Sequence, residues 1–264
     1  MELAVSSWSL RSHVNKDFEL FELPQLVADR FGVHALELCQ MHFYQNLPQY
    51  GIILPGQDVR FLDQVIASVE AANSRVVNVP IDVGNLAQTD PKKRRHEMGV
   101  IKGWMDVAAY IGSECARVNT GRFEGEPDLN VIIDGYRELA EYGDSIGVKL
   151  VMENHWGVSS DPTQIGPIFE GVNHPNFASC PDLGNFPDED REAGLQAIVK
   201  YTDLVHAKTY DFNEDGVMTK FDFPAALDIV KQTGFDGVIS VEFEGDGDQF
   251  EGVAKTIAMV KNLW

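Results

Sequence analysis

The sequence predicts a single (β/α)8 TIM barrel that spans residues 1–264. Short runs of β-branched and apolar residues alternate with longer stretches of helical periodicity up to the last residue. Eight such pairs in 264 residues average 33 residues each, which is the length of a βα unit with short loops. A doubly wound open sheet is the alternative, but no Gly-rich phosphate-binding motif follows the first strand, where residues 6–10 read SSWSL.

The elements follow in a regular order, one helix after each strand. The expected strands cover residues 2–7, 34–38, 75–80, 115–119, 148–153, 177–181, 203–207 and 237–242. The expected helices cover residues 18–31, 58–73, 90–111, 128–146, 162–172, 188–201, 222–233 and 249–262. Glycines that end helices support four of the boundaries, namely Gly32, Gly112, Gly147 and Gly234. Four polar residues are expected as helix N-caps, namely Asp58, Thr89, Asp161 and Asp222.

The composition argues against several classes of partner and compartment. With 41 acidic and 21 basic residues, the net charge of −20 would repel nucleic acids and anionic membranes. The basic run at residues 92–95 is interpreted as a solvated helix face. Three cysteines, Cys39, Cys115 and Cys180, fit neither a disulfide framework nor a thiolate zinc site, so a reducing cytoplasm is expected. Residues 1–10 lack the features of a secretory signal, and no apolar run is long enough to span a membrane.

Four consecutive strands end in side chains that bind metals. The fifth to eighth expected strands deliver Glu153, Asp182, His206 and Glu242 to the mouth of the barrel. A lone Asp at a strand end is usually a helix N-cap, but three carboxylates and an imidazole at one mouth would repel each other without a cation. The four residues together therefore predict a divalent metal site. An oxygen-rich ligand set with one imidazole favours Mn²⁺ or Mg²⁺, with Co²⁺ or Zn²⁺ as alternatives.

Other polar residues near strand ends are candidates for binding the substrate. Lys208 has the same strand parity as His206, and it is expected either to donate to a substrate oxygen or to pair with Asp211 or Glu244 at the rim. His155 is expected at the mouth as a proton shuttle or a substrate donor. Weaker candidates from the first half of the barrel are Trp8 as an aromatic face, Glu37, His42, Asn119, and Arg122 as an anion-binding group or a surface ion-pair partner.

At these motifs the chain resembles the xylose-isomerase-like TIM-barrel superfamily, and within it the sugar isomerases and ketose 3-epimerases. The motifs are VMENH at 151–155, PDLGN at 181–185, VHAK at 205–208 and SVEFE at 240–244. The resemblance implies one divalent ion, commonly Mn²⁺, on Glu153, Asp182, His206 and Glu242. It also implies that the two glutamates act as an acid/base pair on opposite faces of a sugar. Asn185 and Phe212 stand where many ketose 3-epimerases carry His and Arg, so a different substrate orientation is expected around Asn185.

The expected activity is a metal-dependent isomerisation or epimerisation of a small sugar or keto-polyol. Its opening step is abstraction of a proton α to a carbonyl, with a divalent cation stabilising the enediolate. Dehydration or lysis of a keto-sugar or keto-cyclitol, of the inosose or dehydroshikimate type, is the alternative, as is a role as a C-glycoside-cleaving subunit. An apurinic-site endonuclease is less favoured, because seven histidines supply too few ligands for a three-zinc cluster. The resemblance also suggests a homo-oligomer.

Overall fold

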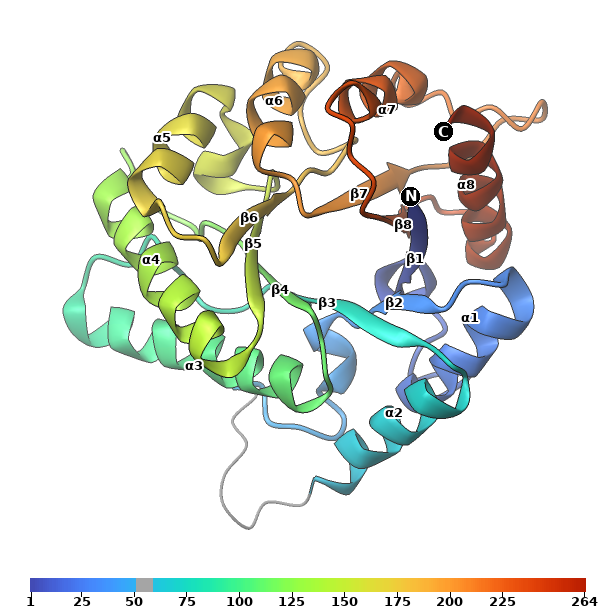
Figure 1. The fold of residues 1–264 in the computed structure, drawn as a ribbon, viewed down its shortest axis with the longest axis horizontal. Coiled ribbons are helices and arrows are strands. Elements are labelled where there is room, and N and C mark those ends of the chain that lie inside the picture. Colours follow the sequence, from blue (N-terminus) through green and yellow to red (C-terminus); the bar gives the residue numbers. More distant parts are fainter. Residues whose placement is uncertain (51–58) are drawn as a thin grey trace.

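The computed structural model describes residues 1–50 and 59–264. Eight parallel strands form one sheet in the order β6-β5-β4-β3-β2-β1-β8-β7 (Figure 1). The bridges Ser179↔Thr202 and Asp182↔His206 join the two ends of this sheet, so that the barrel is nearly closed. The strands are β1 Glu2–Ser6, β2 Ala35–Glu37, β3 Arg75–Ile81, β4 Cys115–Val118, β5 Lys149–Glu153, β6 Phe177–Cys180, β7 Leu204–Thr209 and β8 Val238–Phe243. The predicted (β/α)8 barrel is confirmed.

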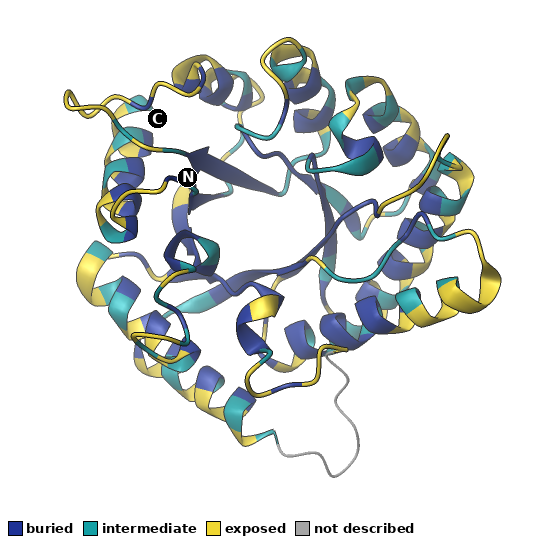
Figure 2. Cartoon of the chain, turned by 180° about the vertical axis from the view of Figure 1, so that it is seen from behind, coloured by how far each residue is buried: buried dark blue, intermediate teal, exposed yellow. Residues whose placement is uncertain are grey.

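The helices surround the barrel, and each turns its buried face towards the strands (Figure 2). They are α1 Leu23–Phe31, α2 Arg60–Ala71, α3 Pro91–Tyr110, α4 Leu129–Ile146, α5 Pro162–Val172, α6 Arg191–Ile198, α7 Phe223–Gln232 and α8 Gln249–Leu263. Two predicted helices are shorter than expected. The first begins as a 3-10 turn at Leu20–Glu22, before Pro24 fixes the first turn of α1, and the sixth ends in a 3-10 turn at Val199–Tyr201.

The predicted helix ends are largely confirmed. All four predicted terminating glycines have positive φ. The side chains of Asp161 and Asp222 accept hydrogen bonds from the first turns of α5 and α7. The prediction for α3 was wrong by one residue: Asp90, not Thr89, caps it, because the Asp90 carboxylate accepts from the amides of Lys92 and Lys93. Asp58 lies outside the described residues.

Strand parity explains why the polar site lies above an apolar floor. A small cluster of buried side chains, one from each of seven strands, fills the lower part of the barrel: Ala4, Ala35, Val77, Cys115, Val151, Cys180 and Leu204. Side chains two residues further along a strand lie on the same face, one layer closer to the carboxyl end. That next layer contains Ser6, Glu37, Arg117, Glu153, Asp182 and His206, all of which are buried. The sequence thus changes from apolar to ionisable inside the barrel within two residues.

A glycine after β4 allows two loops at the mouth to approach each other. Gly121 has φ +91°, and a Cβ there would lie 2.8 Å and 2.9 Å from the backbone nitrogens of Leu86 and Ala87. Gly125, in the same loop, has φ +73° but open space around it. Gly121→Ala is therefore expected to lower the free energy of unfolding by about 1–3 kcal/mol more than Gly125→Ala, because both share the backbone strain and only the first adds a clash. Urea unfolding of both variants checks this, and equal losses would contradict it.

Candidate metal centre and active site

The four predicted metal ligands converge at the top of the barrel. One ligand atom from each of Glu153, Asp182, His206 and Glu242 lies within 4.8 Å of all the others, and all four residues are buried. Asn154 fixes the spacing between β5 and β6, because its side chain donates to the Asp182 carbonyl at 2.9 Å and accepts from the Asp182 amide at 2.7 Å. We call these four candidate ligand residues the quartet.

His206 presents one ring nitrogen to the carboxylates of the quartet and the other to Glu37. Its Nδ1 lies 3.0 Å from Glu153 Oε1, 3.1 Å from Glu242 Oε2 and 3.9 Å from Asp182 Oδ2. Its Nε2 lies 3.0 Å from Glu37 Oε1. A carboxylate on the second ring nitrogen is the usual arrangement for a metal-binding histidine, because it fixes the tautomer and the ring orientation. The structure thus places Glu37, a substrate-binding candidate in the sequence, against His206.

The buried oxygens of the quartet fit a divalent cation. Glu153 Oε2, Asp182 Oδ2 and Glu242 Oε2 accept no hydrogen bond of standard geometry from the described residues, although nitrogens of Arg117, Lys208 and His206, respectively, lie 3.0 Å, 3.1 Å and 3.1 Å away. Asp182 also serves its own loop, since its Oδ1 accepts from the amides of Gly184 and Asn185 at 2.7 Å and 3.1 Å. Asp182 can therefore cap its own loop through Oδ1 while Oδ2 remains available as a candidate metal ligand. Three carboxylates buried this close together are costly, and a divalent cation among them would reduce their mutual repulsion beyond what Arg117 and Lys208 provide.

The charges around the two glutamates keep them ionised. Burial alone would raise the pKa of Glu153, but Arg117 and His206 hold it well below its usual range. Burial likewise opposes ionisation of Glu242, yet Lys208 and His206 lower its pKa to about 2. For Asp182 burial dominates, so its pKa is raised despite Lys208 nearby. Ionised carboxylates are the form that binds a cation and accepts a proton.

Arg117 in β4 is the main member of the site that the sequence analysis missed. Its Nε lies 3.0 Å from Glu153 Oε2, and its Nη1 contacts Asp82 Oδ1, so that one buried guanidinium joins two carboxylates. Asn119 Nδ2 donates to the same Asp82 oxygen at 2.8 Å. The available signal was a charged residue in an otherwise apolar strand, with the same parity as the buried Cys115.

Lys208 is buried among carboxylates, at the place predicted from its strand parity. Its Nζ lies 3.1 Å from Asp182 Oδ2, 3.6 Å from Glu242 Oε1 and 3.3 Å from Glu244 Oε1. It also donates to Asn185 Oδ1 at 2.9 Å, while Asn185 Nδ2 donates to Glu153 Oε1 at 3.2 Å. Lys208 and Asn185 therefore form a bridge between Glu153 and the other two carboxylates of the quartet. Two rim partners were expected for Lys208. Glu244 does pair with it, whereas the Asp211 carboxylate accepts hydrogen bonds from the backbone amides of Asp246 and Gly247.

A cavity of about 130 Å³ opens onto the quartet from the mouth of the barrel. It is lined by Ser6, Trp8, Cys39, Pro80, Asp82, Arg117, His155, His206, Glu242 and Glu244. The predicted residues Trp8 and His155 thus lie in its wall. Arg122 lies elsewhere, because its guanidinium is 5.0 Å from the centre of the Trp156 ring and it lines a separate cavity of about 590 Å³ with Asn85 and Lys93.

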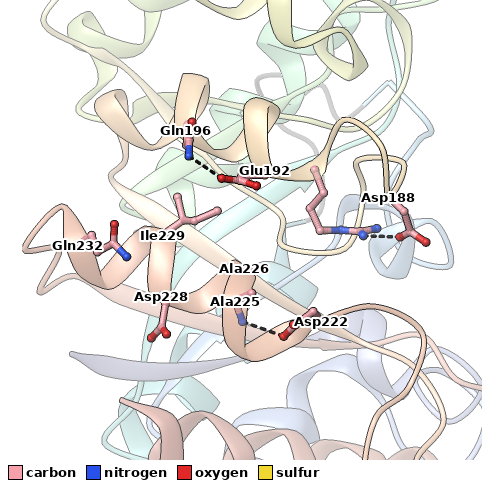
Figure 3. A pocket seen from close by; sticks show the side chains of 10 residues that line it. Asp188, Glu192, Gln196, Asp222, Ala225, Ala226, Asp228, Ile229 and Gln232 are labelled. Atoms are coloured by element: carbon pink, nitrogen blue, oxygen red, sulfur yellow. Dashed lines mark hydrogen bonds and ion pairs between the residues drawn. The ribbon is translucent and has the colours of Figure 1, made fainter.

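A further hollow of about 470 Å³ lies on the outside of the barrel, between α6 and α7 (Figure 3). Its acidic side chains have local structural roles: Asp188 pairs with Arg191, and Asp222 caps α7. Both of its walls are outer helices, and none of its lining residues belongs to the quartet or to the cavity at the mouth. The candidate active site is therefore the smaller cavity at the mouth.

His42, another sequence candidate, packs beneath the mouth with its Nδ1 2.9 Å from Ser7 Oγ. Burial lowers the pKa of His42 from 6.5 to about 4. The unfolded chain therefore binds a proton that the folded protein excludes, and stability that is complete above pH 6.5 is lost as the pH falls towards 4, by up to about 1.4 kcal/mol per pH unit. His42→Gln is expected to remove this contribution. Urea unfolding of wild type and variant between pH 7.5 and 5 checks it, and a pH-independent difference between them would contradict it.

Within the described ranges, no helix combines the length and the apolar character that crossing a lipid bilayer requires. A search of curated protein sequences found no significant match. The family model described as xylose isomerase-like TIM barrel matches residues 26–263.

Solved structures with the same fold include three with informative descriptions. The 3-keto-D-glucoside 4-epimerase YcjR from E. coli is 14% identical, with a TM-score of 0.74 and 99% of each chain covered. The D-allulose 3-epimerase from Methylomonas sp., in complex with D-allulose, is 15% identical, with a TM-score of 0.75 over 100% of this chain and 97% of that one. The IolI protein with a bound zinc atom is 17% identical, with a TM-score of 0.73, and the match covers 100% of this chain and 98% of that one. At these identities the likeness shows a shared fold.

Proposed function

The chain belongs to the xylose isomerase-like TIM-barrel family, and we propose that it is a divalent-metal-dependent enzyme that isomerises or epimerises a small sugar or keto-polyol. One observation carries the proposal: three buried carboxylates and His206 each offer one ligand atom within 4.8 Å of all the others, beside a cavity at the mouth of the barrel. Two neighbours of the same fold that act on sugars, an allulose epimerase and a ketoglucoside epimerase, support the choice of substrate class.

Glu153, Asp182, His206 and Glu242 would hold the metal ion, which we propose to be Mn²⁺. Bound there, a divalent cation supplies Lewis-acid stabilisation of the negative charge that develops on the substrate oxygens during proton abstraction. The bound zinc of the IolI protein shows that a barrel of this fold accommodates a divalent cation.

The chain's own residues provide the proton transfers. Glu153 and Glu242 lie on different strands and each has a cationic neighbour, Arg117 or Lys208, that keeps the carboxylate ionised and oriented. We assign one ionised glutamate to removing the proton α to the carbonyl. The other glutamate must first take up a proton from solvent, which it then delivers to the opposite face of the same carbon, so that one proton is removed and one is added in each epimerisation. Lys208, with Asn185 beside it, is placed to donate to a substrate oxygen as negative charge develops.

The remaining cavity residues are assigned to binding. His155 lies in the wall as a hydrogen-bonding group, and Trp8 offers an indole ring whose Nε1 donates to Glu244 Oε1 at 2.8 Å. A flat ring next to fixed polar groups is a common way to orient a sugar. Arg122 lies outside this cavity, and we assign it no contact with the reacting part of the substrate.

The test combines metal content with hydrogen exchange. Plasma emission on the purified protein is expected to find about one equivalent of divalent metal in wild type and almost none in His206→Ala. With a panel of ketoses in deuterium oxide, wild type is expected to exchange a carbon-bound proton only when metal is present. Failure to bind metal after reconstitution would refute the proposal. Release of water from the substrate would favour the dehydratase alternative, and three equivalents of zinc would favour the nuclease.

A further inference from the structure

A carboxylate on the β3 wall of the cavity has one oxygen anchored and the other unpaired. Asp82 follows β3 directly, and its Oδ1 accepts hydrogen bonds from both Arg117 and Asn119. Its backbone amide donates to Gln40 Oε1 at 3.3 Å, which fixes the start of the loop. Among the described residues, no donor contacts Asp82 Oδ2, and the side chain is 41% exposed in the cavity wall. Asp82 is therefore a hydrogen-bond acceptor in the cavity wall, held through one oxygen by Arg117 and Asn119.

The opposite wall of the cavity also presents carboxylates. Glu242 lies in β8 and Glu244 follows it, and both line the cavity. Glu244 Oε1 accepts from the Trp8 indole, and its side chain remains 26% exposed. A substrate in this cavity thus has acidic oxygen acceptors on two sides.

The positive charges near the cavity are already paired. Arg117 is shared between Glu153 and Asp82, and Lys208 lies among three carboxylates and an amide oxygen. Arg11, which lies 5.4 Å from the Trp8 ring centre, donates to the carbonyl oxygens of Phe243 and Gly245. Even with a divalent ion on the quartet, carboxylates outnumber the positive charges in this part of the barrel.

We propose that Asp82 is a specificity-determining residue that accepts hydrogen bonds from substrate hydroxyl groups, so that the site takes uncharged polyhydroxy carbonyl compounds in preference to phosphorylated or carboxylated sugars. A neutral sugar supplies hydroxyl donors to Asp82 and Glu244, whereas a phosphate or carboxylate brings like charge next to both. This inference deepens the proposed function and rests on it for the identity of the site.

Calorimetric titration of the metal-loaded protein, dialysed free of excess metal, tests the inference with two matched pairs of probes. The probes are D-allulose and D-fructose, each compared with its 6-phosphate. Wild type is expected to bind each neutral ketose at least about tenfold more tightly than its phosphate. Asp82→Asn is expected to bind the neutral ketose more weakly and its phosphate more tightly than wild type does. The ratio of the two affinities is therefore expected to fall at least about tenfold. Metal content and melting temperature confirm that the variant site is intact.

Asp228→Asn is the control for the change in net charge. Asp228 lies in the hollow between α6 and α7, away from the mouth (Figure 3). Its removal changes the total charge by the same amount, so it is expected to leave the preference for neutral ketoses unchanged.

Three results would overturn the inference: equal or tighter binding of the phosphates by wild type, an unchanged affinity ratio in Asp82→Asn, or no binding of either neutral ketose. The inference and the proposed function fail separately. A preference for neutral ketoses that depends on Asp82, without any deuterium exchange, would refute the proposed function and retain the role of Asp82. Metal-dependent deuterium exchange for which a sugar phosphate is the better substrate would support the proposed function and refute the role of Asp82.

Discussion

Glu153→Gln is expected to slow metal-dependent deuterium exchange at the substrate carbon by about 10²–10⁴-fold while the barrel stays folded. The substitution removes the group that accepts the proton but keeps the side-chain volume and one oxygen for a metal. Arg117, which would otherwise be left as an unpaired buried cation, retains Asp82 as its partner. Mass spectrometry at saturating Mn²⁺ measures the rate, so that weaker metal binding by the variant does not limit it.

The pair Glu153→Gln and Glu242→Gln separates the two chemistries of the proposed enzyme. If the glutamates act on opposite faces of the sugar, each variant is expected to block exchange from a different epimer, and both are expected to block interconversion. Loss of exchange from the same substrate in both variants would indicate a single-base isomerisation instead. Glu189→Gln, at an exposed position before α6, is the control and is expected to behave as wild type.

The fold and the quartet were predictable from the sequence because both depend on local regularities. Alternation of strands and helices sets the barrel, and the parallel arrangement brings all strand ends to one mouth. Period-two alternation along several strands then places an ionisable residue on the inner face above the apolar floor, as Leu204 and His206 show in β7. Candidate ligands at the ends of four consecutive strands could be identified without knowledge of the loops.

The parts that the sequence analysis missed depend on contacts across the barrel or on loop direction. Arg117 stands in an apolar strand, and sequence alone does not show that its charge lies between Asp82 and Glu153. Asp82 follows β3, which runs one residue beyond the predicted end at Pro80. Glu37 was identified at its strand end, but its contact with His206 crosses the barrel. The loop after β4 places Arg122 against the Trp156 ring. The path of a loop cannot be predicted from the hydrophobic periodicity of the sequence.

The second large effect concerns Lys208, which balances the quartet with a charge of its own. Burial opposes ionisation of this ammonium group, but Asp182 and Glu242 raise its pKa well above the usual range. Lys208→Met leaves those carboxylates buried without their partner, and removing one member of a buried ion pair costs about 3–5 kcal/mol. We expect that loss in the free energy of unfolding of EDTA-treated protein, measured by urea titration.

Saturating Mn²⁺ is expected to reduce the loss in Lys208→Met, because a divalent cation on the quartet neutralises the same carboxylates that the ammonium group faces. Lys149→Met is the control: its partner Asp203 and Lys149 itself are both about one-third exposed, so the expected loss is below about 1 kcal/mol and independent of metal. A loss in Lys208→Met that is the same with EDTA and with Mn²⁺ would mean that the metal does not bind at the quartet. A stable metal-free variant would mean that Asp182 and Glu242 do not need the positive charge, and that Lys208 is retained for a contact with substrate alone.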